Sequence, residues 1–304
     1  MERFEVTVLG CGSATPTTFR HPSAQIVNVR DKLFMVDCGE GAQVEFRRAK
    51  FNFSRLGHVF ISHLHGDHCF GLPGLLSTLG LMGRVGELVV HSPAGLQKAL
   101  QSLLDGFCQG LSYTVRFEEF AADRPELIYE DRSLTVHTIP LKHNMPCCGF
   151  LFSEKPLARH LRRDMLDFYQ IPIAWRNRIK QGEDFLLPDG TLVPNERLTS
   201  DPRPPRRYAY CSDTAYTTRF VEQIQGVDLL YHEATFAESE SLQAKSRFHS
   251  TARQAAQVAR AASVGKLMLG HFSARYLDCA PLLQEAKDLF PDTLLAVEGK
   301  TMVL

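Results

Sequence analysis

The chain has 304 residues, of which 44% are hydrophobic and 22% charged, and this length allows one large domain or two ordinary ones. Its 34 basic and 34 acidic residues cancel, which excludes a globally basic nucleic-acid-binding protein but permits a local basic patch. It contains no run of about 18 apolar residues that would span a bilayer, and its start, MERFEVTVLG, has no signal-peptide core. We therefore expect a cytoplasmic protein with no membrane partner.

The predicted elements of the first half alternate between strands and helices. Val, Ile and Phe dominate the strand-like runs, and Gly, Ser and Pro follow them. Strands are predicted at residues 4–9, 25–29, 32–38, 57–62, 87–93, 111–120 and 133–141, and helices at 41–51, 72–82 and 94–104. Pro73 falls in the opening turn of the second helix, where a missing N–H costs little.

The same alternation resumes in the second half of the chain. Strands are predicted at residues 207–214, 228–236 and 266–273, with a strong helix at 251–262, and the chain closes with LLAVEGKTMVL. Two blocks of alternating strands and helices indicate a layered α/β fold with helices outside the sheets. Residues 154–207 interrupt the pattern with seven prolines, the only tryptophan and many arginines, so we expect an insert there.

The segment HLHGDH, residues 63–68, holds three histidines and an aspartate in six positions. On an extended strand end, His63 and His65 point to the same side and can hold one ion. Gly66 lets the backbone turn, so Asp67 and His68 can face a neighbouring position. A packed core would exclude so many polar side chains, and one segment therefore offers ligands to two metals.

Further ligands would have to come from strand ends later in the chain. His143, Asp213 and His271 are the candidates. Imidazole and carboxylate ligands suit Zn²⁺, with manganese or iron as alternatives, and one aspartate such as Asp213 can bridge two ions. Single histidines elsewhere are interpreted as ordinary surface or core residues: His58, His91, His137 and His160.

Two other features receive no chemical role. The eight cysteines are scattered and include no CxxC pair, so they are expected to be reduced, and adjacent Cys147 and Cys148 are interpreted as small buried residues. The loop VLGCGSATP lacks both the GxGxxG spacing and a Walker lysine, and is interpreted as a tight turn near the site.

Taken together, these stretches resemble the ribonuclease Z family of the metallo-β-lactamase superfamily. The matching stretches are VDCGEG at 36–41, SHLHGDHCFGLPGLL at 62–76, the His143 to Phe150 region, SDT at 212–214, HEATF at 232–236, HSTA at 249–252 and GHFSARY at 270–276. The resemblance implies a four-layer αββα sandwich, expected as one domain over residues 1–304 with an inserted basic arm at about 154–207. It also implies a homodimer, as for the short form of the family.

For the site, the resemblance implies two Zn²⁺ ions per chain, with Mn²⁺ or another divalent metal possible. It assigns His63, His65 and His143 to one metal, Asp67, His68 and His271 to the other, and Asp213 as the bridge. Asp37 becomes a carboxylate that orients a ligand without contacting metal. The implied reaction removes the 3′ trailer from precursor tRNA and leaves a 3′-hydroxyl on the tRNA and a 5′-phosphate on the trailer.

Two proton transfers accompany this reaction. Asp67 is expected to accept the proton of the attacking water, and His249, held by Glu233, to protonate the leaving 3′ oxygen. An alternative is that His249 is merely exposed before a helix capped by Ser250 or Thr251.

The resemblance also places a tRNA-binding arm in the middle of the chain. Residues 155–182 carry seven basic side chains against two acidic ones: Lys155, Arg159, Arg162, Arg163, Arg176, Arg178 and Lys180. These would neutralise phosphates, although a solvated face is the alternative, and the segment lacks the family's Gly-Pro tip. Two other functions remain open: a phosphodiesterase or other hydrolase of a small substrate on the same fold, and a metal-binding scaffold without catalysis.

Overall fold

The computed structural model describes residues 2–304. Chain contacts divide the protein into two compact units, which we call the body (Met1–Ser153 and Arg206–Leu304) and the arm (Glu154–Pro205). Within residues 2–304, no helix combines the length and apolar character needed to cross a membrane.

The body contains two seven-stranded sheets. The first has the order β18-β1-β2-β3-β4-β5-β6, and the second β17-β16-β15-β14-β9-β8-β7. The strands of the first sheet are β1 (Phe4–Gly10), β2 (Ala24–Val29), β3 (Lys32–Cys38), β4 (Leu56–Phe60), β5 (Leu88–Pro93), β6 (Val115–Phe120) and β18 (Thr301–Val303). Those of the second are β7 (Leu127–Glu130), β8 (Leu134–Pro140), β9 (Cys148–Glu154), β14 (Arg207–Cys211), β15 (Leu229–Glu233), β16 (Lys266–Gly270) and β17 (Thr293–Leu295).

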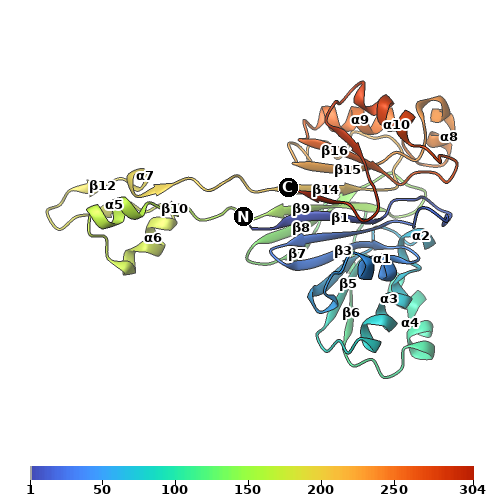
Figure 1. Ribbon diagram of the computed structural model, residues 1–304, viewed down its shortest axis with the longest axis horizontal. Coiled ribbons are helices and arrows are strands. Elements are labelled where there is room, and N and C mark those ends of the chain that lie inside the picture. Colours follow the sequence, from blue (N-terminus) through green and yellow to red (C-terminus); the bar gives the residue numbers. More distant parts are fainter. Residues whose placement is uncertain (1) are drawn as a thin grey trace. The chain divides into compact units, whose positions relative to one another are not determined.

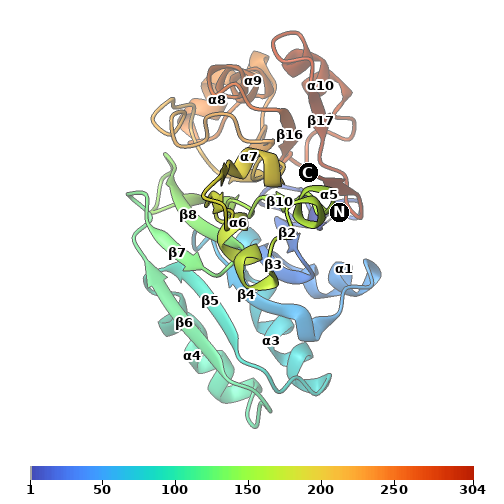
Figure 2. The same cartoon turned by 90° about the vertical axis from the view of Figure 1, so that its left-hand side faces the viewer.

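Helices cover the outer face of each sheet. The longer ones are α1 (Ala42–Arg48), α3 (Leu72–Leu81) and α4 (Leu96–Phe107) on the first sheet, and α9 (Ala252–Ala261) and α10 (Ala280–Lys287) on the second. The short ones are η1 (Phe53–Arg55), α2 (Gly66–Cys69), η3 (Glu238–Glu240) and α8 (Ser241–Ser246). Figures 1 and 2 show the resulting layers, helices, sheet, sheet, helices, which confirm the predicted αββα sandwich.

Burial on both faces holds these layers together. One hydrophobic core combines side chains of both sheets with those of α9, and a second joins the first sheet to α1, α3 and α4. Every residue of β2, AQIVNV, is buried, as expected for a strand covered on both sides. Burial of this kind stabilises the fold by about 25 cal/mol per Å² of apolar surface.

Parallel strands bring the future site together at one edge of the sheets. In the second sheet β14, β15 and β16 are mutually parallel, so their carboxyl ends lie side by side. In the first sheet β3, β4 and β5 are also parallel. The segments that follow β4, β14 and β16 carry all but one of the residues predicted from sequence to bind metal, and the remaining one, His143, follows β8. This is the end of a parallel sheet where ligand sites usually form.

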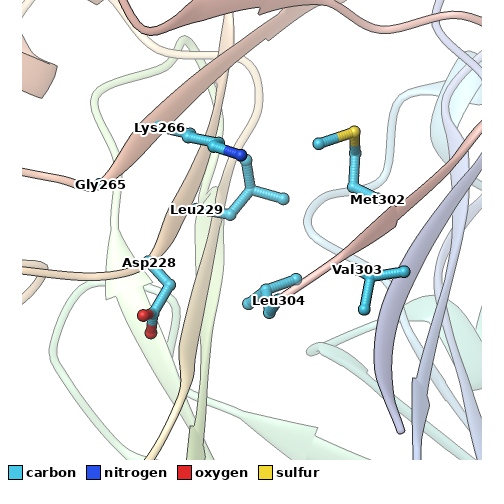
Figure 3. A pocket seen from close by; sticks show the side chains of 7 residues that line it. All are labelled: Asp228, Leu229, Gly265, Lys266, Met302, Val303 and Leu304. Atoms are coloured by element: carbon cyan, nitrogen blue, oxygen red, sulfur yellow. The ribbon is translucent and has the colours of Figure 1, made fainter.

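The opposite ends of these strands surround a different hollow. A cavity of about 240 Å³ opens beside the amino ends of β15 and β16 (Figure 3). Its lining residues are Asp228, Leu229, Gly265, Lys266, Met302, Val303 and Leu304. Its side chains are mainly apolar, and its two charged residues are Asp228 and Lys266, so the cavity offers no set of metal ligands.

The body has a strand or a helix at each predicted position, and it also has elements that had no prediction, namely β7, α10 and the short helices η1, α2, η3 and α8. The edge strand β7 has four residues, LIYE, and lacks an alternating pattern of burial. The helix α10, APLLQEAK, buries only Leu282 and Ala286. Both are too short to leave a clear periodic signal in the sequence.

The arm has its own small core. Its elements are β10 (His160–Leu161), α5 (Arg163–Phe168), η2 (Ile173–Trp175), α6 (Arg176–Lys180), β11 (Phe185–Leu186), β12 (Leu192–Val193), α7 (Asn195–Leu198) and β13 (Thr199–Ser200). Leu166, Ile171, Ile179 and Phe185 are among the side chains buried there. Asn195 fixes the backbone from inside, because its amide group donates to the carbonyl oxygens of Ile179 and Glu183.

Candidate metal centre

The segment after β4 carries four of the predicted ligands. His63 is buried, and His65 has extended backbone angles just before the short helix α2. Asp67 and His68 lie on α2 itself. At Gly66 a Cβ atom would come within 2.4 Å of the Phe70 ring, so a larger residue there would displace that ring. The spacing HxHxDH thus places two histidines before the turn and two ligands after it.

The first group of nitrogen atoms belongs to three histidines. His63 Nε2 lies 2.9 Å from His65 Nδ1, and His143 Nε2 lies 3.2 Å from the same Nδ1. His143 comes from the segment after β8, far from the other two in sequence. Together with Asp213, these side chains place one ligand atom each within 4.8 Å of one another.

The second group combines Asp67, His68 and His271. His68 Nε2 and His271 Nε2 are 3.3 Å apart, and each lies 3.5 Å from Asp67 Oδ2. The backbone N–H of Ala14 donates to the same carboxylate at 2.7 Å, which fixes its orientation. His271 immediately follows β16 and has a positive φ of 55°.

Asp213 lies between the two groups, with one oxygen toward each. Its Oδ2 is 3.6 Å from His63 Nε2 and 3.7 Å from His143 Nε2. Its Oδ1 is 3.2 Å from His68 Nε2 and 3.1 Å from His271 Nε2. The geometry therefore separates the donors into the two sets expected from sequence, with Asp213 as the shared carboxylate.

Asp37 orients His68 from behind. Its Oδ2 accepts from His68 Nδ1 at 2.7 Å and from the Tyr210 hydroxyl at 2.6 Å, and its Oδ1 accepts from the Ser62 N–H. A carboxylate only accepts hydrogen bonds, so Nδ1 of His68 carries the proton and Nε2 presents its lone pair to the centre. Asp37 was predicted to act in this way, and its side chain does not reach the two groups of donors.

Two other histidines are oriented in the same manner. His143 Nδ1 donates to the Phe248 carbonyl oxygen at 3.1 Å. His271 Nδ1 lies 2.9 Å from Thr235 Oγ1, which itself donates to Glu233. Each ring thus uses one nitrogen for support and turns the other toward the centre. Five imidazoles and two carboxylates held in this way fit divalent cations.

The pKa shifts of Asp213 and His63 agree with this fit. For His68, in contrast, burial is outweighed by the carboxylates of Asp213, Asp37 and Asp67, which raise its pKa well above its usual value. Burial alone would raise the pKa of Asp213, but His271 and His68 outweigh it and hold that pKa well below its usual range. Burial and the nearby His68 lower the pKa of His63 well below its usual value. An ionised carboxylate and a neutral imidazole are the forms that bind metal.

His249 and Glu233 form a pair beside these groups. His249 Nδ1 lies 2.9 Å from Glu233 Oε1, and Glu233 is fully buried at the end of β15. Burial disfavours the charged imidazole, but the Glu233 carboxylate outweighs it and raises the pKa of His249 to about 9. Thr251 caps α9, as the alternative interpretation expected, but His249 before it is not merely exposed, because its side chain is only 16% exposed. His249 remains free to face the site.

A pocket of about 430 Å³ opens over the centre. It is lined by Ala14, Glu40, His65, Gly66, Asp67, Phe70, Asp213, His249 and His271. The pocket is therefore large enough for a small part of a larger substrate, and it exposes both the carboxylates and His249.

The remaining histidines lie elsewhere, as predicted. His58 and His91 stack against Phe34 and Phe60 between the two sheets. His137 is on β8 and His160 is in the arm. The sequence interpretation missed the supporting roles of Ala14 and Thr235, which rest on a backbone N–H and a hydroxyl that have no characteristic spacing.

Two family models match the chain. The anti-Pycsar protein Apyc1 family matches residues 4–158, and the beta-lactamase superfamily domain matches residues 197–272. Both matches cover segments that supply candidate ligands, and both agree with the αββα layers of the body.

Full-length relatives narrow the assignment. The chain is 60% identical over 298 residues to ribonuclease Z of Phocaeicola vulgatus, covering 98% of this chain and 96% of that protein. It is 57% identical over 304 residues to ribonuclease Z of Bacteroides thetaiotaomicron, covering 100% and 96%. The crystal structure of human tRNase Z, short form, superposes with a TM-score of 0.71 at 25% identity over 98% of each chain. The chain belongs to the ribonuclease Z family of the metallo-β-lactamase superfamily.

Proposed function

We propose that this protein is a metal-dependent endoribonuclease that removes the 3′ trailer from precursor tRNA. The observation that carries this proposal is the position of His249 beside the seven converging donors, in a chain that is ribonuclease-Z-like from end to end. Because its substrate would be precursor tRNA, we assign the protein to the cytoplasm. The products are a tRNA with a 3′-hydroxyl and a trailer with a 5′-phosphate.

The metal is a divalent cation, and we assign two zinc ions per chain. One is held by His63, His65 and His143, the other by Asp67, His68 and His271, with Asp213 between them. When bound, such ions lower the pKa of a water molecule and neutralise charge on the phosphodiester. Seven donors exceed the four that a single tetrahedral zinc accepts, which supports the count of two.

The side chains of the pocket move the protons. As water attacks the phosphorus, the Asp67 carboxylate accepts its proton. The bond from phosphorus to the 3′ oxygen breaks, and protonated His249 delivers a proton to that oxygen. Glu233 stabilises the charged form of His249 and holds its ring at 2.9 Å.

The arm would bind the tRNA away from the cut. Counted over residues 154–205, nine Lys and Arg face eight Asp and Glu, so its net charge is much smaller than the window 155–182 indicates. Arg159 and Arg178 are paired with Asp201 and Glu183, which lie outside that window. Exposed Arg163 and Lys180 have no acidic partner within 4 Å in residues 2–304, and they support phosphate contact.

We assign a homodimer on the basis of an exposed apolar surface. Leu81, Val85 and Phe107 are 86%, 83% and 81% exposed near the carboxyl ends of α3 and α4. These two helices each follow a strand of the same parallel set, so their carboxyl ends lie at the same end of the sheet. Light scattering of a Leu81→Glu variant tests this surface: a monomer supports it, and an unchanged dimer contradicts it.

A second candidate is a phosphodiesterase of a small substrate. The pocket of about 430 Å³ over the donors is the observation behind it, because a small ester fits within such a pocket. One experiment separates the two functions: single-turnover cleavage of a precursor tRNA with a 3′ trailer, with mapped product ends, beside hydrolysis of a nitrophenyl phosphodiester. Cleavage at the tRNA 3′ end supports the ribonuclease, and hydrolysis of the small ester alone supports the rival.

A further inference from the structure

Phe70 is an aromatic side chain that the proposed chemistry does not use. It follows α2 directly and lines the pocket that holds Asp67 and His249. Its surface is 67% exposed. Single exposed apolar residues are common on proteins, so the position of this one inside the pocket is what calls for an explanation.

The ring is held in place from one side only. It packs over the α-carbon of Gly66, where a Cβ atom would lie within 2.4 to 2.7 Å of three ring carbons. Gly66 and Phe70 are joined across α2 by a 2.8 Å backbone hydrogen bond. Within residues 2–304, no other ring and no cation stacks on Phe70. The opposite face of the ring is therefore open.

We propose that Phe70 is a stacking platform for the nucleobase next to the scissile phosphate. The inference rests on the proposed function, and it names how the pocket positions its substrate. Asp67 lies on α2 and Phe70 follows it directly, so a base stacked on Phe70 has its phosphate close to the donor groups. Every base has an aromatic face, so such a platform accepts any base and suits an enzyme whose substrates vary in sequence there.

A base stacked on Phe70 lies beside the donor groups of the pocket. Without such a stack, those groups would contact only the phosphate. Glu40 and Ala14 also line the pocket, and neither offers an aromatic face. Removal of one base–aromatic stack reduces binding by about 5- to 150-fold. We therefore expect Phe70→Leu, which keeps the apolar contact with Gly66, to lower kcat/KM for precursor tRNA by a factor within this range.

The decisive experiment combines this variant with altered substrates. Kinetics are measured on precursor tRNA, on the same RNA with an abasic site at the last tRNA nucleotide, and with one at the first trailer nucleotide. If Phe70 stacks on a base, Phe70→Leu and the wild type have about the same kcat/KM on one of the abasic substrates. Phe70→Trp restores activity on the intact substrate, and Leu242→Ala, which removes an exposed apolar side chain that does not line the pocket, changes nothing.

A purely structural role gives a different pattern. An equal defect of Phe70→Leu on all three substrates, or no defect on the intact one, overturns the platform while leaving the proposed function in place. Metal content and circular dichroism of the variants show whether the centre is intact. If the wild-type protein does not cleave precursor tRNA at all, the proposed function fails, and the platform fails with it.

Discussion

The Nδ1 atom of His249 lies 2.9 Å from Oε1 of Glu233, and the two residues differ in their access to solvent. The Glu233 side chain is fully buried, whereas that of His249 is 16% exposed and lines the pocket. Glu233 also accepts from the Thr214 N–H and from the Thr235 hydroxyl. A carboxylate fixed by these two donors therefore holds an imidazole that faces the substrate.

We expect His249→Ala to slow cleavage of precursor tRNA by about 10² to 10⁴-fold, the usual contribution of a positioned acid. Metal content should stay near that of the wild type, because the seven converging donors remain. On a nitrophenyl diester the defect should shrink, since that leaving group hardly needs a proton. An equal defect on both substrates would show that His249 positions or folds the site instead of donating a proton.

Replacement of Glu233 by Gln tests the electrostatic part of the pair. The carboxylate raises the pKa of His249, so its removal should lower that pKa. The protonated form of His249 is the acid, and activity falls as it loses its proton. The basic limb of the pH–rate profile should therefore move to lower pH in Glu233→Gln. A basic limb at the wild-type position would mean that the profile reports another group.

The bridging role of Asp213 predicts the largest effect on metal binding. Its two oxygens face different histidine pairs, so Asp213→Ala should weaken both sites at once. Elemental analysis should find about two divalent ions per wild-type chain, and fewer in the variant at equal protein concentration. His137→Ala is the matched control, because His137 lies on β8 outside the two groups. One ion per chain in fully active wild-type enzyme would contradict the dinuclear assignment.

How well each part of the site could be predicted depends on how close its residues are in the sequence. His63, His65, Asp67 and His68 are close in sequence, and local strand and turn geometry was enough to indicate a metal site. Asp213 and His271 meet them only because the sheets pack face to face. Their positions at strand ends made them candidates, but their assignment to particular metals came from the family resemblance. The body's elements had clear periodicity, apart from short ones such as β7.

The arm shows where a sequence window misleads. Residues 155–182 do contain more basic than acidic residues. In the folded arm, however, Arg159 pairs with Asp201 and Arg178 with Glu183. Arg178 also stacks on Trp175 at 4.0 Å from the ring centre. Charge counted along the chain omits partners brought in by folding. The supporting hydrogen bond from Ala14 to Asp67 was equally invisible, since almost any residue has a backbone N–H.

A pair of histidines between the sheets predicts acid sensitivity of the fold. His58 Nδ1 lies 3.0 Å from His91 Nε2, and the pair packs among Phe34, Phe60 and Tyr129. Burial lowers the pKa of His58 to about 4 and that of His91 to about 3. The unfolded chain takes up protons near pH 6.5 while the folded one does not, so stability should fall as pH drops from 6.5 toward 4.

His58→Asn tests this, because the amide keeps a polar atom near the position of Nδ1 but does not titrate. The free energy of unfolding, measured with urea, should be lower at pH 5 than at pH 7 in the wild type. In the variant this decrease should be about 1–2 kcal/mol smaller. His160→Asn, in the exposed part of the arm, should leave the decrease unchanged. If His58→Asn has the wild-type pH dependence, other buried groups cause the acid sensitivity.

Removal of the arm should separate substrate binding from chemistry. Ser153 is paired directly with Arg207 across β9 and β14, so a short Gly/Ser turn can replace residues 155–205 without stretching the sheet. The candidate ligands and His249 lie outside this segment, and hydrolysis of a nitrophenyl diester should survive. If the arm binds tRNA remotely, its interactions are the same in the ground and transition states. Its removal should then raise KM for precursor tRNA more than it lowers kcat.

The number of phosphates that the arm neutralises can be measured in the same proteins. Each phosphate that the protein no longer binds should reduce the salt slope of tRNA binding by about 0.7 to 0.9. Because several arm cations already have acidic partners, we expect a change of about two phosphates from Arg163 and Lys180, which an Arg163→Ala/Lys180→Ala variant should reproduce. Arg159→Ala is the control, since its guanidinium is engaged by Asp201. Unchanged affinity and salt slope in the armless protein, shown to be folded and metal-loaded, would place tRNA binding on the body, on surfaces such as that of Arg47, Arg48 and Lys50.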